Sequence, residues 1–298
     1  MALPMPITAL TQYFGGKRTL APRIVAEQGP HNCYWEPMCG SLGVILAKPP
    51  VSMETVSDLH GGVTCLARVV AHDQLAQQLY DRLNRTLACE GIFDDAKAYV
   101  GKVGTDWPDC DLDAAYNFFI SSWLGMGGMN GTRHTNESFC VRYTNTGGNQ
   151  STRLDNAVQS IPAWHERLKG VTILRRSVFD LLPRIADEDG VVIYLDPPYV
   201  VKGGKYVHDF KLADHERLTN EAKRFRKTRV MISYYDDPLV RRLYAGWTFV
   251  ACTMAKSLGN QGMRGKPGSK TKSPEVLIIN GPSLTTGVSI FQEDEWPD

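Results

Sequence analysis

The sequence predicts an α/β fold built on a mostly parallel sheet that is interrupted by an inserted segment. Short apolar segments alternate with segments of helical periodicity, which is typical of parallel sheets. Residues 191–195 (V-V-I-Y-L) are continuously apolar, as expected for a strand buried on both faces. The alternation stops near residue 71 and resumes near 166, so we expect one sheet-forming domain of residues 1–70 and 166–298 around an inserted subdomain of residues 71–165.

The first half of the expected sheet lies near the N-terminus. Residues 33–36 form a short apolar and aromatic strand candidate that ends in Pro and Gly, and residues 42–46 follow with helical spacing. Residues 53–57 predict a second strand that closes on Asp58, and residues 62–79 have the periodicity of one helix. The pattern therefore predicts strand, turn and helix, then a second strand and helix.

The insert and the second half of the sheet differ in pattern. From residue 81 to about 164 we expect helical pieces and then a stretch, residues 125–150, that is dense in Gly, Asn, Thr and Arg. Alternation then returns, and the last two strands are expected to pair as an antiparallel hairpin. In order, the segments are a strand at 171–174, a strand at 191–195, a helix at 213–227, a strand at 229–234, a helix from 238, and strands at 247–253 and 275–280.

Composition excludes several classes of protein. With 43% hydrophobic and 22% charged residues, the chain is expected to be globular, neither disordered nor fibrous. No apolar run reaches the ~18 residues that span a bilayer, and the N-terminus lacks a secretion signal. The seven cysteines are scattered without a C-x-x-C pair, which disfavours both a zinc site and a disulfide framework. We expect a cytoplasmic protein with no membrane and no metal partner.

Basic residues are concentrated locally, because the net charge is only +1. Lys256, Arg264 and Lys266 lie in a Gly- and Ser-rich run, residues 256–272, that is too irregular for a helix or strand. A second basic cluster, residues 223–229, is interpreted as a solvated helix end, where cations are favoured.

The strongest single signal is Asp196-Pro197-Pro198-Tyr199, which directly follows the buried strand. It places a carboxylate at the carboxyl edge of a parallel sheet, where open α/β folds bind ligands. The prolines fix the local backbone, so the Asp196 oxygen and the Pro197 carbonyl can each accept an N–H bond from a planar amine, while Tyr199 offers a ring for stacking. The alternative is a rigid strand exit in which the Asp caps a turn.

Several segments resemble a known family in the expected order. D-P-P-Y, with Y-F-G-G-K at residues 13–17, W-E-P-M-C-G-S-L-G at 35–43 and S-P-E-V-L-I-I-N at 273–280, resembles the Dam-like, alpha-group adenine-N6 DNA methyltransferases. The resemblance spans roughly residues 11–280. It implies a class I S-adenosylmethionine-dependent methyltransferase fold, Rossmann-like, with an antiparallel C-terminal hairpin. It also implies methyl transfer to N6 of an adenine flipped out of double-stranded DNA.

The resemblance also implies roles for individual residues. Lys17 would pair with the methionine carboxylate of the cofactor, Gly40 would let the backbone approach it, and Asp58 would accept from the ribose hydroxyls. The implied catalytic residues are Asp196, Pro197, Pro198 and Tyr199, and the implied cofactor-binding residues are Tyr13, Gly16, Lys17, Glu36, Pro37, Cys39, Gly40, Asp58, Ser177, Val178 and Asp196.

One position departs from the family pattern. Family members usually carry an acidic residue at the position of Ser177, where it meets the adenine moiety of the cofactor. Ser177 or the Val178 amide can serve instead, and Asp180 is expected to be an exposed carboxylate at a helix start. The departure bears on cofactor affinity.

DNA recognition is expected in the insert. Asn130, Arg133 and Arg142 lie where family members carry a DNA-reading hairpin, although the side-chain identities match poorly. Arginine can bind guanine and asparagine can bind adenine, whereas the alternative is that these are surface loop charges. Residues 202–210 and the basic run with Lys256, Arg264 and Lys266 are expected to hold opened DNA.

Three other functions stay open at this point. An RNA or protein-amide methyltransferase shares the D-P-P-Y chemistry, and a catalytically inactive DNA-binding relative is compatible with Ser177. A nicotinamide oxidoreductase is disfavoured because the first turn lacks G-x-G-x-x-G. The sequence predicts a bacterial or phage-encoded enzyme, but not its recognition sequence, its oligomeric state or whether it belongs to a restriction-modification system.

Overall fold

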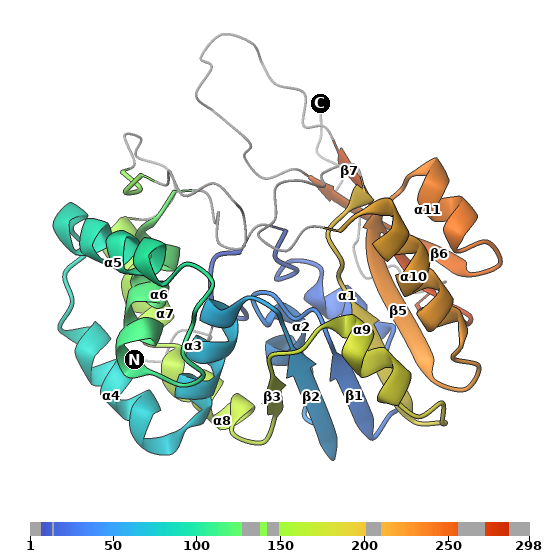
Figure 1. Ribbon diagram of the computed structural model, residues 1–298, viewed down its shortest axis with the longest axis horizontal. Helices are drawn as coiled ribbons and strands as arrows, with labels where there is room; N and C mark the ends of the chain where they lie inside the picture. Colours follow the sequence, from blue (N-terminus) through green and yellow to red (C-terminus); the bar gives the residue numbers. More distant parts are fainter. Residues whose placement is uncertain are drawn as a thin grey trace, which may run out of the picture.

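The structure is a computed structural model that describes residues 7–13, 15–126, 138–141, 149–200, 210–255 and 272–285. Its centre is a seven-stranded sheet in the order β3-β2-β1-β4-β5-β7-β6 (Figure 1). The strands are β1 (Cys33–Glu36), β2 (Met53–Ser57), β3 (Thr172–Leu174), β4 (Val191–Leu195), β5 (Arg229–Tyr235), β6 (Thr248–Ala255) and β7 (Lys272–Ile279).

The first five strands are parallel, and β7 runs antiparallel to both β5 and β6. The predicted terminal hairpin is therefore confirmed, with β7 inside the sheet and β6 at its edge. The chain leaves β1 for β2 and β3 on one side and returns to β4 on the other. This reversal creates a switch point between β1 and β4, the place where open α/β sheets bind ligands.

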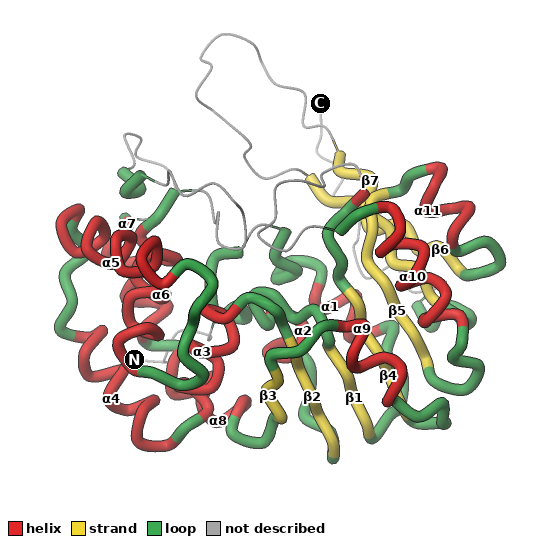
Figure 2. The backbone as a smooth tube through the Cα atoms, in the orientation of Figure 1, coloured by secondary structure: helices red, strands yellow, loops and turns green. Residues whose placement is uncertain are grey.

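Helices flank both faces of the sheet, as Figure 2 shows. In the sheet-forming regions they are α1 (Ala21–Ala26), α2 (Gly43–Ala47), α3 (Gly61–Ala71), α9 (Val178–Leu181), the 3₁₀ turn η1 (Leu182–Arg184), α10 (Leu212–Lys223) and α11 (Pro238–Leu243). In the insert they are α4 (Asp73–Asn84), α5 (Glu90–Val103), α6 (Leu112–Leu124), α7 (Gln150–Val158) and α8 (Ile161–Leu168). None of the helices among the described residues combines the length and apolarity that a membrane crossing requires.

Two helix predictions need correction. The single helix expected at residues 62–79 is two helices, because His72 has extended backbone and its Nδ1 accepts from the Leu75 N–H to start α4. The helix expected at 213–227 ends at Lys223. The carboxylate of Asp187 accepts from the backbone N–H groups of residues 226, 227 and 228, which holds that segment as a turn leading into β5.

The sheet separates two apolar clusters. Along β4, Val192 and Tyr194 pack with α1, α2, α3 and the insert helices, whereas Ile193 and Leu195 pack with α9, α10 and α11. Successive strand residues point to opposite faces, so all five residues of β4 are buried. The continuous apolar run in the sequence is thereby explained.

A buried ion network, which we call the Glu54 network, joins the sheet to the insert. Glu54 on β2 accepts from Lys48 after α2, at 2.5 Å, and from both Nη atoms of Arg167 on α8, at 2.6 and 2.7 Å. Burial opposes ionisation of Glu54, yet the hydrogen bonds of Arg167 and Lys48 hold the pKa of this carboxyl below its ordinary value. The network stays charged and fixes α8 to the sheet.

A second buried carboxylate ties the end of α1 to residues near the C-terminus. Glu27 is 0% exposed and accepts from Ser283 Oγ at 2.5 Å and from Leu284 N at 2.8 Å. Thr285 and Arg229 also donate to it. Burial raises the pKa of Glu27, but these hydrogen bonds outweigh it and the pKa is lowered. The carboxylate is thus a fixed structural anion.

Candidate active site

A cavity of ≈ 270 Å³ lies where β1, β2 and β4 end. All eleven predicted cofactor-binding residues line it, although they come from five separate stretches of the sequence. The other residues that line it are Gly15, Met38, Ser41, Gly43, Val44, Leu59, His60, Phe179, Tyr194, Pro198, Phe210 and Asp214, of which only Pro198 was predicted individually as a site residue.

The turn after β1 is held by Asp58, which follows β2. One oxygen of Asp58 accepts from Gly40 N and the other from His60 N, both at 2.8 Å. Gly40 has φ +46°, a conformation that favours glycine, and it faces the ring of Tyr13. Asp58 therefore fixes the shape of the turn that lines the cavity, while the start of α3 is capped by His60.

Glu36 is buried at the end of β1 and accepts from Tyr34 Oη at 2.9 Å. Burial and the nearby Asp196 raise the pKa of Glu36 to about 8. At neutral pH the carboxyl is mostly protonated in the absence of a cation. A positively charged ligand beside it would favour the ionised form.

The Asp196 corner, defined here as Lys17, Asp196, Tyr199 and Glu275, joins the two ends of the described chain. Lys17 Nζ lies 2.7 Å from Asp196 Oδ2 and 3.5 Å from Glu275 Oε1, and it donates to the Gly15 carbonyl at 2.8 Å. Tyr199 Oη donates to Glu275. Lys17 is only 7% exposed, so its ammonium is held by these partners away from bulk water.

The charges of this corner set its protonation. Burial raises the pKa of Asp196 to about 6, and the attraction of Lys17 offsets only part of that rise. Burial lowers the pKa of Lys17, but the two carboxylates outweigh it and the net shift is upward. At neutral pH the corner thus contains an ammonium and an ionised Asp196.

Two of the predicted catalytic residues lie behind the cavity wall. Pro197 and Tyr199 are buried and do not line the cavity, whereas Asp196 and Pro198 do. The Tyr199 ring packs edge-to-face on Tyr235 with centroids 4.5 Å apart, and Lys17 Nζ lies 5.1 Å from its centre. Stacking of Tyr199 on a substrate base stays a prediction.

Ser177, the position that departs from the family pattern, lies at the rim of the cavity near β3. Ser177 Oγ accepts from Phe179 N at 3.2 Å and caps α9, and Val178 is buried beside it. Asp180 is exposed in the first turn of α9, as expected, and does not line the cavity. Phe179 stacks on Phe210 with centroids 5.5 Å apart and planes at 14°. Sequence reasoning missed this aromatic pair, although Phe179 directly follows Val178.

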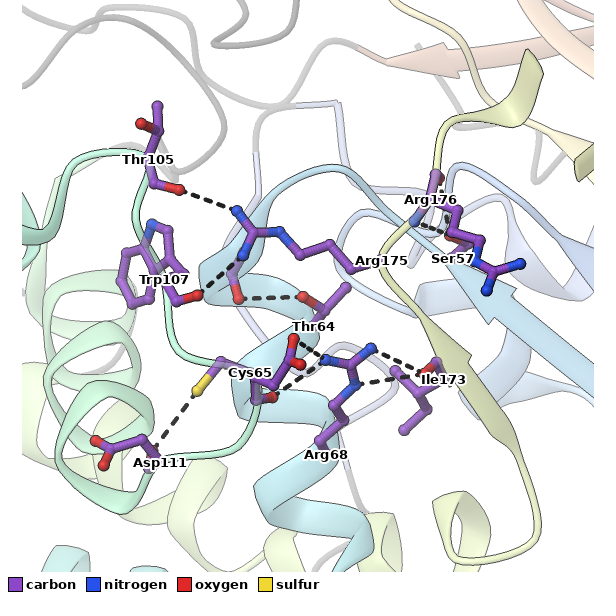
Figure 3. Close-up of polar contacts among 12 residues, drawn as sticks. Ser57, Thr64, Cys65, Arg68, Thr105, Trp107, Asp111, Ile173, Arg175 and Arg176 are labelled. Atoms are coloured by element: carbon purple, nitrogen blue, oxygen red, sulfur yellow. Dashed lines mark hydrogen bonds and ion pairs between the residues drawn. The ribbon is translucent and has the colours of Figure 1, made fainter. Parts of the chain in front are cut away.

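The insert supplies the wall behind His60. The His60 ring lies 6.1 Å from that of Trp107 and 5.3 Å from that of Phe118. Figure 3 shows Arg175, next to the rim, donating to the carbonyls of Thr105 and Trp107, both at 2.9 Å. A Cβ on Gly61 would lie 2.3 Å from Trp107 Cβ, so glycine is required for this packing.

The predicted DNA-binding residues Asn130, Arg133, Arg142, Lys256, Arg264 and Lys266 lie outside the described residues. Next to that region, Gly125 and Phe139 form an antiparallel bridge. In the part of the chain that the structure describes, no group of three or more His, Cys, Asp and Glu side chains is arranged to hold a metal ion.

The cavity chemistry fits S-adenosylmethionine, which carries a sulfonium and an ammonium. The described lining residues contain four carboxyl groups, those of Glu36, Asp58, Asp196 and Asp214, and one ammonium, that of Lys17. The aromatic ring of Phe179 at the far rim suits a flat heterocycle.

The strand order and the acidic cavity at its switch point are those of a class I methyltransferase, an enzyme that uses S-adenosylmethionine. Within that class, the chain belongs to the D12 class N6 adenine-specific DNA methyltransferase family, whose model matches residues 13–256. It is therefore an enzyme that methylates adenine in DNA, as the sequence predicted.

A solved structure, the rRNA methyltransferase AviRa from Streptomyces viridochromogenes, is similar over 87% of this chain and 82% of its own, with 13% identity and a TM-score of 0.34. No curated protein matches the chain.

Proposed function

We propose that this enzyme methylates N6 of an adenine flipped out of double-stranded DNA, at a specific sequence, with Asp196 as the group that binds the amine. The observation that supports this most is the orientation of Asp196. Lys17 binds Oδ2 at 2.7 Å and so fixes the direction of the carboxylate, and an ionised carboxylate has further lone pairs that can accept a substrate N–H. Asp196 also lines the cavity that fits the cofactor.

Asp196 and the Pro197 carbonyl would each accept one hydrogen of the adenine amino group. Both hydrogen bonds draw the nitrogen lone pair out of conjugation with the ring, so it becomes a better nucleophile. When bound, S-adenosylmethionine supplies a methyl group on a positively charged sulfur. Once the amino nitrogen is methylated, Asp196 would take one of its protons along the hydrogen bond and pass that proton to solvent.

Lys17 would keep Asp196 ready for this role. Its ammonium favours the ionised carboxylate against the effect of burial and holds one oxygen in a fixed direction. Glu275 in turn holds both Lys17 and the Tyr199 hydroxyl. Lys17 thus orients the acceptor, and its contact with the methionine carboxylate of the cofactor stays a prediction.

The remaining lining residues would hold the cofactor. Glu36 ionises beside its cationic methionine end, and Asp58 accepts from the ribose hydroxyls with lone pairs not used by Gly40 and His60. At the adenine end, the Val178 amide and the Phe179 ring replace the missing acidic side chain. The Ser177 oxygen is engaged in capping α9.

We assign the catalytic domain to residues 1–70 and 166–298 and target recognition to the insert, residues 71–165. The helices of the insert lie together at one end of the sheet in Figure 1, which supports this division. Asn130, Arg133 and Arg142 would read bases, and Lys256, Arg264 and Lys266 would contact phosphates. The substrate places the enzyme in the cytoplasm of a bacterium or of a phage-infected host.

The test is nucleoside mass spectrometry of unmethylated duplex DNA after incubation with the enzyme and S-adenosylmethionine. The expected product is N6-methyladenine, absent with Asp196→Ala, and mapping its positions gives the recognition sequence. If no duplex is methylated while RNA is, the proposed substrate is wrong.

A further inference from the structure

A second cavity, of ≈ 450 Å³, lies between the N-terminal segment and the insert. Residues 7–13 run along the insert, where Gln12 N donates to Ser122 Oγ and Trp123 Nε1 donates to the Leu10 carbonyl. The cavity is lined by Ile7, Ala9, Thr11, Gln12, Tyr13, Gly16, Arg18, Ser41, Trp123, Arg153 and Asn156. Tyr13, Gly16 and Ser41 also line the cofactor cavity, so these residues lie between the two cavities.

The charge of the second cavity is opposite to that of the first. The ionisable side chains among its described lining residues are Arg18, Arg153 and Tyr13, and no acidic residue lines it. Gln150 Oε1 accepts from Arg153 Nη1 at 3.2 Å, which holds the guanidinium near the cavity. Thr11 is 2% exposed, and its hydroxyl has no hydrogen-bond partner among the described residues. A polar anion is the ligand that this lining suits.

We propose that the second cavity binds a backbone phosphate of the DNA close to the target adenine. Arginine guanidinium groups bind phosphate oxygens with paired N–H donors, and the amides of Gln12 and Asn156 add further donors. Lys17 and Arg18 are adjacent in the chain, so a phosphate at Arg18 lies near the nucleotide held at Asp196. This assignment rests on the proposed DNA substrate and specifies where its backbone is bound.

Binding of labelled duplex DNA, measured by fluorescence anisotropy over a series of salt concentrations, tests the proposal. Each phosphate contact contributes about one unit to the slope of log affinity against log salt, so Arg18→Gln and Arg153→Gln should each lower the slope by up to ~1. Arg226→Gln is the matched control, because Arg226 is exposed and precedes β5, which lies on the other side of the β1–β4 switch point from β2 and β3. Slopes equal to that of the unaltered enzyme in both cavity variants would overturn the proposal.

Inorganic phosphate distinguishes DNA from a free anion as the ligand. If phosphate binds the unaltered enzyme, fails to bind the double variant, and the DNA slopes do not change, the cavity serves a free anion and the DNA assignment is wrong. Failure of the proposed function looks different, because the unaltered enzyme would then leave duplex DNA unmethylated.

Arg175 lies where the insert meets the cofactor cavity, and its contacts support a second, independent inference. Its guanidinium fixes the carbonyls of Thr105 and Trp107 (Figure 3), and Trp107 packs on His60, which lines the cavity and donates its N–H to Asp58. We infer that Arg175 is a positioning residue for cofactor binding that acts through Trp107 and His60.

The Kd of S-adenosylhomocysteine, measured by calorimetry, tests this role, because the measurement involves no catalytic turnover. Arg175→Gln should raise the Kd about fivefold to tenfold, the effect of weakening about one charge-assisted hydrogen bond, and Arg175→Lys should restore part of the affinity. Arg68→Gln is the control. Arg68 binds the same loop at Asp109, at 2.7 Å, and the Ile173 carbonyl, but it has no contact with Trp107 in Figure 3.

Melting temperatures separate positioning from general stability. Both variants should lower Tm, because both loosen the loop at residues 104–111, but only Arg175→Gln should change the Kd. Equal Kd values for Arg175→Gln and the unaltered enzyme, or an equal rise with Arg68→Gln, would show that Arg175 has no specific role. If the unaltered enzyme does not bind S-adenosylhomocysteine, the proposed function itself fails.

Discussion

The Asp196 corner and the Glu54 network contain the same kinds of residue in opposite proportions. In the Asp196 corner, Lys17 forms ion pairs with both Asp196 and Glu275. In the Glu54 network, Lys48 and Arg167 both form ion pairs with Glu54. Burial raises the pKa of Asp196 to about 6, because the one shared ammonium offsets only part of that rise. The two cations beside Glu54 outweigh the effect of burial, and the pKa of Glu54 is lowered.

This difference distinguishes a reactive site from a structural one. A carboxylate with two cations has satisfied oxygens and stabilises the packing of the insert. A carboxylate that shares one cation with a second carboxylate keeps capacity to accept another hydrogen bond, which a substrate amine can supply. The number of cations per carboxylate, more than the residue types, indicates which cluster can bind a substrate amine.

The largest expected effect comes from neutralising Asp196. Asp196→Asn should lower kcat by at least about a thousandfold, because an amide accepts the amino hydrogen weakly and cannot take the proton. Methylation of duplex DNA measured with radiolabelled cofactor checks this. Glu54→Gln in the structural network is the matched variant, and if it loses as much kcat at low temperature, the distinction between the two clusters fails.

Replacing each of the two lysines by methionine tests the comparison between the two clusters. Lys17→Met should lower kcat about tenfold to a hundredfold, because Asp196 loses its orienting cation. It should also destabilise the fold, because two buried carboxylates lose their shared ammonium. Lys48→Met should leave kcat near normal and destabilise the fold by about 1–3 kcal/mol, since Glu54 keeps Arg167 but loses one buried partner. Urea unfolding measures the loss of stability in each variant, and initial rates measure kcat. A larger loss of kcat in Lys48→Met than in Lys17→Met would contradict the assignment.

The pH dependence of the rate should reflect the raised pKa of Asp196. As pH falls through about 6 the carboxylate is protonated and loses its acceptor oxygen, so kcat/KM should fall about tenfold per pH unit below that value. The rate profile is measured between pH 5 and 8, with circular dichroism to confirm folding. A rate that stays level down to about pH 4.5 would rule out Asp196 as the titrating group.

The smallest expected effect is on stability. The folded pKa of Asp196, about 6, lies above the ordinary value of 3.8, so the folded state binds more protons in that window and loses stability as pH rises through it. Asp196→Asn should therefore stabilise the protein by about 1 kcal/mol at pH 7, part of the gain being offset because Lys17 loses a partner. The gain should shrink towards pH 4, and thermal unfolding at both pH values measures it.

Residues that act through local motifs were predictable from the sequence. Asp196 follows a buried strand, and Gly40 follows another, so strand endings place both at one edge of the sheet. Three strands, at 33–36, 53–57 and 191–195, were predicted with their observed bounds.

Residues that act through distant packing were not predictable. Glu275 lies in a segment that was recognised, yet nothing local indicates that its carboxylate reaches Lys17. Trp107 belongs to the insert and meets His60 through a loop whose carbonyls Arg175 binds. Pairing over such separations depends on the complete fold, which a pattern along the chain does not contain.

The buried Glu27 has a consequence for how the protein is made. Its partners Ser283 and Thr285 lie 256 and 258 residues further along the chain. At synthesis rates of about 5–20 residues per second, the ribosome needs roughly 10–50 s after Glu27 before it has added them. During that time the carboxylate at the end of α1 lacks these partners, so the final docking of this helix onto the sheet follows the synthesis of residues 283–285.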